Sequence, residues 1–141
     1  MHQVTPSTIL ALDVGERRVG VARASTMARL PSTLTTLQRS ASTADDVKKL
    51  MSAEGASILV VGLPRGLNGQ HTAQTEAVQT FGRELEQVVG VPLQWQDEAV
   101  TSRKAEAELE SRGKPYQKGD IDALSAVYIL EDFLRDHPEV S

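Results

Sequence analysis

The chain has 141 residues, 40% of them hydrophobic, and a formal net charge of −4. This length predicts one domain over residues 1–141, and the absence of cysteine excludes disulfides, thiolate metal sites and a cysteine nucleophile. No apolar run could cross a bilayer and no secretory signal begins the chain, so we expect a cytoplasmic protein that contacts no membrane. Five arginines within residues 14–39 predict a basic patch beside an acidic body.

The order of the predicted elements indicates the fold class. Three β-rich segments joined by turns predict an antiparallel meander, and the alternation of helices and strands that follows predicts parallel additions to the same sheet. The result is an α/β protein, ribonuclease-H-like in element order, with a mixed five-stranded sheet and helices on both faces. The predicted strands are 7–13, 17–25, 32–38, 57–62 and 91–96, and the predicted helices are 43–54, 72–89, 101–112 and 121–134.

Local signals refine this outline. Ser42 with Asp45 forms an N-terminal capping pattern for the first helix. The apolar run 57–62 is typical of a central strand that is covered on both faces. A basic loop, 113–119, lies between two glycines, and we expect it to be mobile until a nucleic acid binds.

Three carboxylates are hard to explain as solvated surface. Asp13 ends the first strand, Glu98 follows the last strand, and Asp122 lies in the predicted first turn of the last helix, on an apolar stripe. Because the carboxyl ends of parallel strands share one edge of a sheet, these acids should converge there. Converging carboxylates repel each other unless a cation neutralises them, and oxygen ligands favour Mg²⁺ or Mn²⁺. Two such ions about 4 Å apart can cleave phosphodiesters.

Simpler roles for the same acids stay open at this point. Asp13 could hydrogen-bond the turn at Gly15, Asp120 could be the N-cap of the last helix, and Asp122 could complement the helix dipole. Two glycine-rich turns, "VGERRVG" and "GLPRGLNG", could present backbone N–H groups to phosphate. Neither turn matches a P-loop.

Four blocks together resemble the YqgF/RuvX family. They are "ALDVGERRVGVA", "VVGLPRGLNG", "DEAVTSRKAE" and "KGDIDALSAVYILEDFL", in family order over about residues 8–136. The resemblance implies a ribonuclease-H-like nuclease, similar to the Holliday-junction resolvase RuvC, that matures the 5′ end of pre-16S rRNA. It also implies that Asp13, Glu98 and Asp122 are the catalytic and metal-binding acids.

The third block departs from the family pattern. Ala99 stands where the family usually has an arginine, and the two hydroxyl residues that follow in the pattern are present as Thr101 and Ser102. If that arginine binds substrate phosphate, another cation must replace it, such as Arg103 or Arg17. The expected nucleic-acid-binding residues are Arg17, Arg18, Arg23, Arg103, Lys114 and Lys118.

The leading hypothesis is a hydrolase of ester bonds, a nuclease that uses two Mg²⁺ or Mn²⁺ ions in rRNA processing. Its expected partners are nucleic acid, either pre-rRNA or branched DNA, and a second copy of the chain in a homodimer. The alternatives are resolution of Holliday junctions and a non-catalytic, RNA-binding factor in ribosome assembly. An actin-like nucleotide-binding domain also begins with a strand, Asp and Gly, but needs two such domains, and 141 residues supply one.

Overall fold

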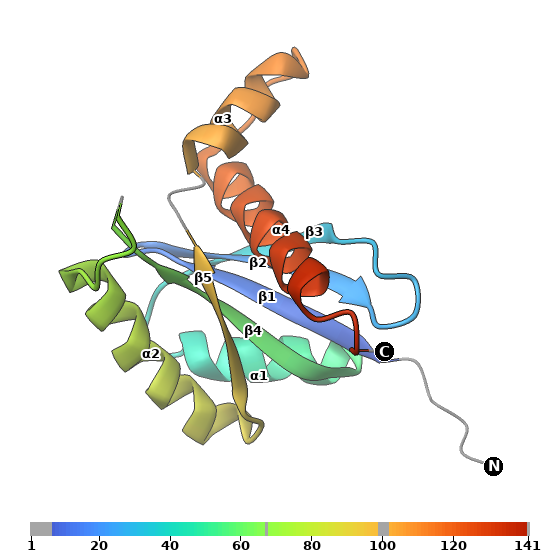
Figure 1. The fold of residues 1–141 in the computed structure, drawn as a ribbon, viewed down its shortest axis with the longest axis vertical. Coiled ribbons are helices and arrows are strands. Elements are labelled where there is room, and N and C mark those ends of the chain that lie inside the picture. The colour runs from blue at the N-terminus through green and yellow to red at the C-terminus, as the bar shows by residue number, and fades with distance from the viewer. Residues whose placement is uncertain (1–6, 67, 99–101, 141) are drawn as a thin grey trace.

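The computed structural model describes residues 7–66, 68–98 and 102–140. One mixed sheet of five strands, in the order β3-β2-β1-β4-β5, organises them (Figure 1). The strands are β1 Thr8–Val14, β2 Arg18–Ser25, β3 Ser32–Gln38, β4 Ala56–Pro64 and β5 Leu93–Glu98, and the helices are α1 Thr43–Glu54, α2 Ala73–Val89, α3 Ser102–Ser111 and α4 Lys118–Asp136. In the described residues no helix is long and apolar enough to span a membrane.

The topology predicted from the sequence is confirmed. β1 pairs antiparallel with β2, and β2 pairs antiparallel with β3, as a meander requires. β4 pairs parallel with β1, and β5 pairs parallel with β4, so the carboxyl ends of these three strands meet at one edge. This edge is where α/β sheets place their sites, and β1 brings Asp13 to it.

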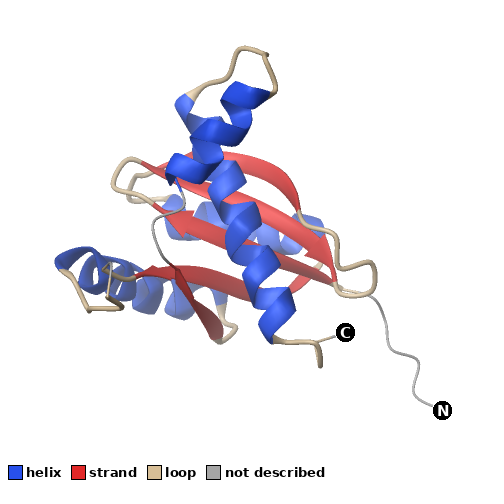
Figure 2. Cartoon of the chain, turned by 45° about the horizontal axis from the view of Figure 1, so that its top comes forward, coloured by secondary structure: helices blue, strands red, loops and turns tan. Residues whose placement is uncertain are grey.

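Each face of the sheet is covered by different helices. Alternate residues of β1 point to opposite faces, so Ile9 and Ala11 pack with α3 and α4, whereas Leu10 and Leu12 pack with α1 and α2. Figure 2 shows α4 crossing the front of the sheet, with α1 and α2 behind it. The period of two therefore fixes the face of Asp13, which must be the face that α4 covers.

Two glycines let α4 approach the sheet on either side of Asp13. Gly20 of β2 pairs with Asp13, and a Cβ atom at Gly20 would lie 1.9 Å from the backbone oxygen of Asp122. Gly62 of β4 lies one residue beyond the Leu12–Val61 pair, and a Cβ there would lie 2.4 Å from Ile129 Cδ1. A side chain at Gly20 would meet backbone atoms, so this close approach requires glycine there.

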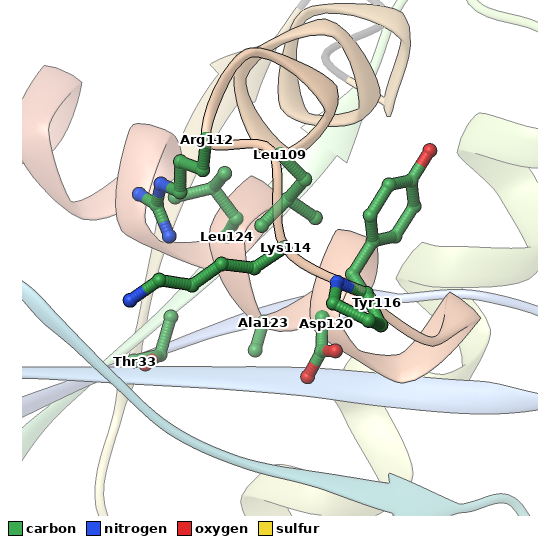
Figure 3. A pocket seen from close by; sticks show the side chains of 9 residues that line it. Thr33, Leu109, Arg112, Lys114, Tyr116, Asp120, Ala123 and Leu124 are labelled. Atoms are coloured by element: carbon green, nitrogen blue, oxygen red, sulfur yellow. The ribbon is translucent and has the colours of Figure 1, made fainter.

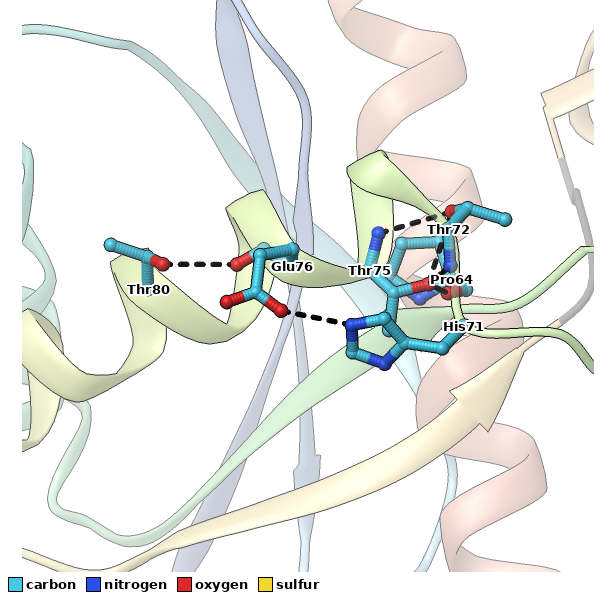
Figure 4. A network of polar contacts seen from close by, with 6 residues as sticks. All are labelled: Pro64, His71, Thr72, Thr75, Glu76 and Thr80. Carbon is cyan, nitrogen blue, oxygen red and sulfur yellow. Dashed lines mark hydrogen bonds and ion pairs between the residues drawn. The ribbon is translucent and has the colours of Figure 1, made fainter.

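The start of α1 corrects one detail of the sequence analysis. Ser42 occupies the N-cap position of α1, but its side chain makes no capping hydrogen bond. α2 has a better cap, because Thr72 and Thr75 bond each other reciprocally and Thr75 Oγ1 donates to the carbonyl of Pro64 (Figure 4). The same picture shows His71 in the preceding loop paired with Glu76 at 2.9 Å.

α4 begins earlier than the sequence pattern predicted. The backbone N–H of Gln117 donates to the Asp120 carboxylate at 2.8 Å, so Gln117 is the N-cap and the helix starts at Lys118. The assignment of Asp120 as the N-cap was therefore wrong, and Asp122 lies in the second turn. The basic loop is shorter than the predicted 113–119, and half-buried Tyr116 packs against the core on the α4 face.

Candidate metal and nucleic-acid site

The first acid of the site is held close to the sheet. Asp13 is the sixth residue of β1 and lies opposite Gly20. Burial, and then the negative charge of Asp122, raise the pKa of Asp13 to about 7. No hydrogen bond from its side chain to the Gly15 turn is found in the described residues, and that turn is closed by Gly15 N–H donating to the Arg18 carbonyl at 2.9 Å. The turn therefore gives Asp13 no capping role.

The second acid is carried by α4. Asp122 accepts a hydrogen bond from Arg18 Nε at 2.6 Å, and both side chains are half-buried. The pairing couples the start of β2 to the second turn of α4, across 104 residues of sequence. Arg18 thus supplies the positive charge that lets two carboxylates share this corner of the protein.

Glu98, the third predicted acid, is not joined to this pair. It ends β5 and is only 9% exposed. Burial, a hydrogen bond with Asp132 and the charge of Asp132 raise the pKa of Glu98 to about 9, against the opposing charge of Arg135. Asp132 lies ten residues beyond Asp122 on α4, which is about 15 Å along the helix axis. The structure therefore brings Asp13 and Asp122 together and places Glu98 beside a different acid.

The residues that are present fit a divalent cation. No cluster of three or more metal-ligating side chains occurs within residues 7–66, 68–98 and 102–140. Asp13 and Asp122 nevertheless offer carboxylate oxygens, which Mg²⁺ and Mn²⁺ prefer, and a cation would relieve the repulsion between them, which adds to the effect of burial on the pKa of Asp13. One buried oxygen of Glu98, Oε1, has no hydrogen-bond partner among the described groups, so this acid retains a free ligand atom.

In the second glycine-rich turn, three of the described backbone N–H groups donate within the turn itself. In the β4–α2 loop, Gly66 N–H donates to the Gln70 carbonyl at 2.9 Å, and Asn68 N–H donates to Gln70 Oε1 at 2.8 Å. Gly69 N–H donates to the Gly66 carbonyl, also at 2.9 Å. The expectation that this loop presents these three N–H groups to phosphate is therefore wrong for this conformation.

The predicted basic residues divide into three groups. Arg18 lies beside Asp122, and Lys114 and Lys118 line cavities next to the start of α4. Arg23 does not flank the site, because its place in β2 directs it to the α1 face, where it pairs with Glu54 at 2.9 Å. Arg17 and Arg103 are exposed. Ala99 and Thr101 lie outside the described residues, as does the side chain of Ser102.

Sequence reasoning missed the partners of the acids. Neither the Arg18–Asp122 pair nor the Glu98–Asp132 pair was predicted, because each joins elements that are distant in sequence. The signal that could have found the first pair is Gly20. The hairpin register places it opposite Asp13, and a glycine within an apolar strand marks a close approach of another backbone.

Together the sheet order, the covering helices and the acids at the strand ends define an α/β protein of the ribonuclease-H-like class. A family model described as "RuvX: Holliday junction resolvase" matches residues 7–136, and the chain belongs to this family. Among its relatives is a Chloroflexus aggregans protein, 40% identical over 90% of this chain and 92% of its own length. A Gloeothece citriformis relative is 37% identical over 89% of this chain and 85% of its own length. Both are named "Putative pre-16S rRNA nuclease".

Solved structures support the fold assignment. Thermus thermophilus RuvC in complex with a Holliday junction substrate matches with a TM-score of 0.56 and 14% identity, over 92% of this chain and 96% of RuvC. A second structure of this RuvC matches with a TM-score of 0.51 and 13% identity, over 93% and 96% of the two chains. At this identity the likeness concerns the fold, and the ribonuclease-H-like prediction is confirmed.

Proposed function

We propose that this protein is a metal-dependent endonuclease that hydrolyses phosphodiester bonds in the 5′-end processing of pre-16S rRNA. The observation that carries the proposal is the half-buried pair of Asp13 and Asp122 at the carboxyl edge of the sheet, where the pKa of Asp13 rises to about 7. The relatives' names support the substrate, since proteins 37–40% identical are named for this activity.

Each residue has a role in this proposal. Asp13 and Asp122 hold the cation, and Mg²⁺ or Mn²⁺, when bound, supplies an activated water and charge stabilisation at the leaving oxygen. Arg18 neutralises Asp122 in the ion-free protein, and a cation at the acids frees its guanidinium to bind a phosphate. Glu98 completes the acid set, and this role requires its carboxyl group to leave Asp132.

A second candidate function is cleavage of branched DNA. The family description names Holliday junction resolution, and a RuvC structure with bound junction has the same fold. The same acids would serve both substrates, because phosphodiester hydrolysis does not depend on the sugar attached. A preference for one substrate over the other must therefore come from the residues that surround the acids and not from the acids themselves.

The test compares cleavage of a pre-16S rRNA fragment and a four-way DNA junction, with Mg²⁺ or Mn²⁺, by wild type and Asp13→Asn. We expect cleavage of the rRNA fragment at its 5′ boundary and loss of that cleavage in the variant. Cleavage of the junction alone would favour the second candidate. If wild type binds the rRNA fragment but cleaves neither substrate, the protein is a binding factor in ribosome assembly and the proposal fails.

A further inference from the structure

Two cavities beside the start of α4 meet. The smaller, of about 240 Å³, lies under the loop between α3 and α4, and the larger, of about 540 Å³, lies between β3 and the first turns of α4. Thr33, Asp120 and Ala123 line both. We call this continuous depression the β3–α4 groove. Its outer part is the larger cavity and its inner part the smaller one.

The β3–α4 groove is positively charged although the chain is acidic. Four cations line it, Arg18, Arg112, Lys114 and Lys118, and Asp120 is the one carboxylate among the lining residues. Arg18 and Arg112 are paired with Asp122 and Glu108, so the two lysines supply the free positive charge. Asp120 is already used, because it accepts the N–H of Gln117 at 2.8 Å. In the part of the chain that the structure describes, neither lysine forms an ion pair, and both lie where the dipole of α4 adds positive potential. An anion is therefore the expected occupant.

The two parts of the groove differ in chemistry. The outer part is lined by threonines of β3 and by Lys118, whose polar groups suit phosphate and sugar oxygens. The Thr36 hydroxyl already donates to the Gly119 carbonyl at 2.6 Å. The inner part has apolar walls from Leu109, Pro115 and Leu124. Figure 3 shows the Lys114 side chain between Arg112 and Thr33, so the apolar space opens next to cationic groups. A flat apolar ring attached to a phosphate, which is a nucleotide, matches this arrangement.

The shape of the groove favours an unpaired strand over a duplex. A base in a double helix is covered by its neighbours and lies behind its own backbone, so it cannot enter a cavity behind a loop. An unstacked base can do so, and positively charged grooves with sites for bases are how proteins bind single strands. The groove also leads to the acids, because Arg18 lines its outer part and contacts Asp122 at 2.6 Å.

We propose that the β3–α4 groove binds an unpaired strand of nucleic acid and leads it to the Asp13–Asp122 pair, with one base in the inner part. That the strand reaches the acids for cleavage rests on the proposed function, whereas its binding in the groove does not. The nuclease would then act where a duplex opens into a single strand.

The test blocks the groove at the point where its two parts meet. Thr33 is exposed and lines both, so Thr33→Trp fills the junction without disturbing the core. Ser32→Trp is the matched control, because Ser32 is the exposed neighbour on the same strand and lines neither cavity. Fluorescence anisotropy in EDTA measures the affinity for a labelled duplex with a single-stranded overhang and for the blunt duplex of the same sequence.

We expect wild type and Ser32→Trp to bind the overhang substrate about tenfold more tightly than the blunt duplex. Thr33→Trp should lose this preference while keeping its affinity for the blunt duplex. The double variant Lys114→Gln, Lys118→Gln should also lose the preference for the overhang, because it removes the positive charges of the two lysines without filling the groove. If Thr33→Trp keeps the full preference, or if wild type shows none, the proposal is overturned.

Further arms separate this proposal from the nuclease assignment. Overhangs of RNA and of DNA should both bind, since phosphate and base are common to them. Asp13→Asn should keep the overhang preference. A protein that shows the preference, loses it in Thr33→Trp and cleaves nothing with added Mg²⁺ or Mn²⁺ refutes the nuclease and supports the groove. Cleavage by a protein that shows no overhang preference supports the nuclease and overturns the groove proposal.

Discussion

Two pairs of carboxyl groups lie between the sheet and α4, and their repulsion is relieved in different ways. In the Asp13–Asp122 pair, the guanidinium of Arg18 neutralises Asp122 at 2.6 Å, and the pKa of Asp13, about 7, leaves that carboxyl group about half ionised at neutral pH. In the Glu98–Asp132 pair, the pKa of Glu98 is raised to about 9, so at neutral pH that pair holds a proton. A bound guanidinium can be exchanged for a metal ion, and a metal ion displaces a proton more easily from a group whose pKa is about 7 than from one whose pKa is about 9. The first pair is therefore better prepared to bind an ion, and it is the one beside the β3–α4 groove.

The largest expected effect is a difference in cleavage rate between variants of the two pairs. Asp122→Asn removes a charge from the first pair, so cleavage of the best nucleic-acid substrate should fall on the order of 100-fold or more. Asp132→Asn removes a charge from the second pair, releases Glu98, and should leave most of the activity. Initial cleavage rates at saturating Mg²⁺ or Mn²⁺ measure both. Equal losses in the two variants, at equal folded fractions, would mean that both pairs belong to one catalytic site.

Metal binding, measured without any substrate, should also distinguish the Asp13–Asp122 pair from the Glu98–Asp132 pair. An ion that binds only the folded protein stabilises it by about 2.7 kcal/mol at about 100 times its Kd, which raises the Tm. The rise should be absent in the triple variant Asp13→Asn, Glu98→Gln, Asp122→Asn and present in Asp132→Asn. A rise that survives the triple variant would place the ion elsewhere.

Stability in EDTA should depend on pH in different windows for the two pairs. A carboxyl group whose pKa is higher in the folded protein binds its proton more tightly there, so the free energy of unfolding falls as pH rises from the unfolded to the folded pKa. For Asp13 the window runs from 3.8 to about 7, and for Glu98 from 4.5 to about 9.

Asp13→Asn should therefore raise the Tm at pH 7, and its advantage should vanish towards pH 4. Between pH 7 and pH 9, only Glu98→Gln should flatten the decline in Tm. Thermal melts across this range measure both effects. A Tm of wild type that stays constant from pH 5 to pH 9, where the global fold is otherwise intact, would contradict the raised pKa values.

The sequence was sufficient for the sheet and for its edge. Apolar periodicity and turn residues predicted the five strands, and their order followed from the meander and the later αβ alternation, as the observed order β3-β2-β1-β4-β5 confirms. Alternation along β1 also determines that Asp13 shares a face with Ile9 and Ala11. These features depend on short-range patterns, and such patterns are visible in one sequence.

The pairing of the acids could not be predicted in the same way. Where α4 crosses the sheet depends on side-chain volumes, such as the missing Cβ of Gly20 under Asp122 and of Gly62 under Ile129. That crossing decides that Asp122 lies near Asp13 and that Asp132, rather than Asp122, lies near Glu98. The start of α4 was also missed, because the Gln117–Asp120 cap precedes the apolar stripe that marks the helix.

The smallest effect concerns the arginine that distinguishes the first pair. If Arg18 is released to a phosphate, Arg18→Ala with Arg17→Ala should flatten the log–log salt dependence of nucleic-acid binding by about one unit for each phosphate that the variant no longer binds. Arg23→Ala is the matched control, since Arg23 lies in the same strand but pairs with Glu54 on the opposite face, and its slope should not change. Asp122→Asn should act in the other direction, because it frees Arg18 without a metal ion and removes a charge that repels phosphate. Titrations of a nucleic acid that the protein does not cleave, at several salt concentrations, give the slopes, with Mg²⁺ or Mn²⁺ present for wild type and the arginine variants and with EDTA for Asp122→Asn. A slope in the double variant that equals that of Arg23→Ala would leave Arg18 as a structural partner of Asp122 only.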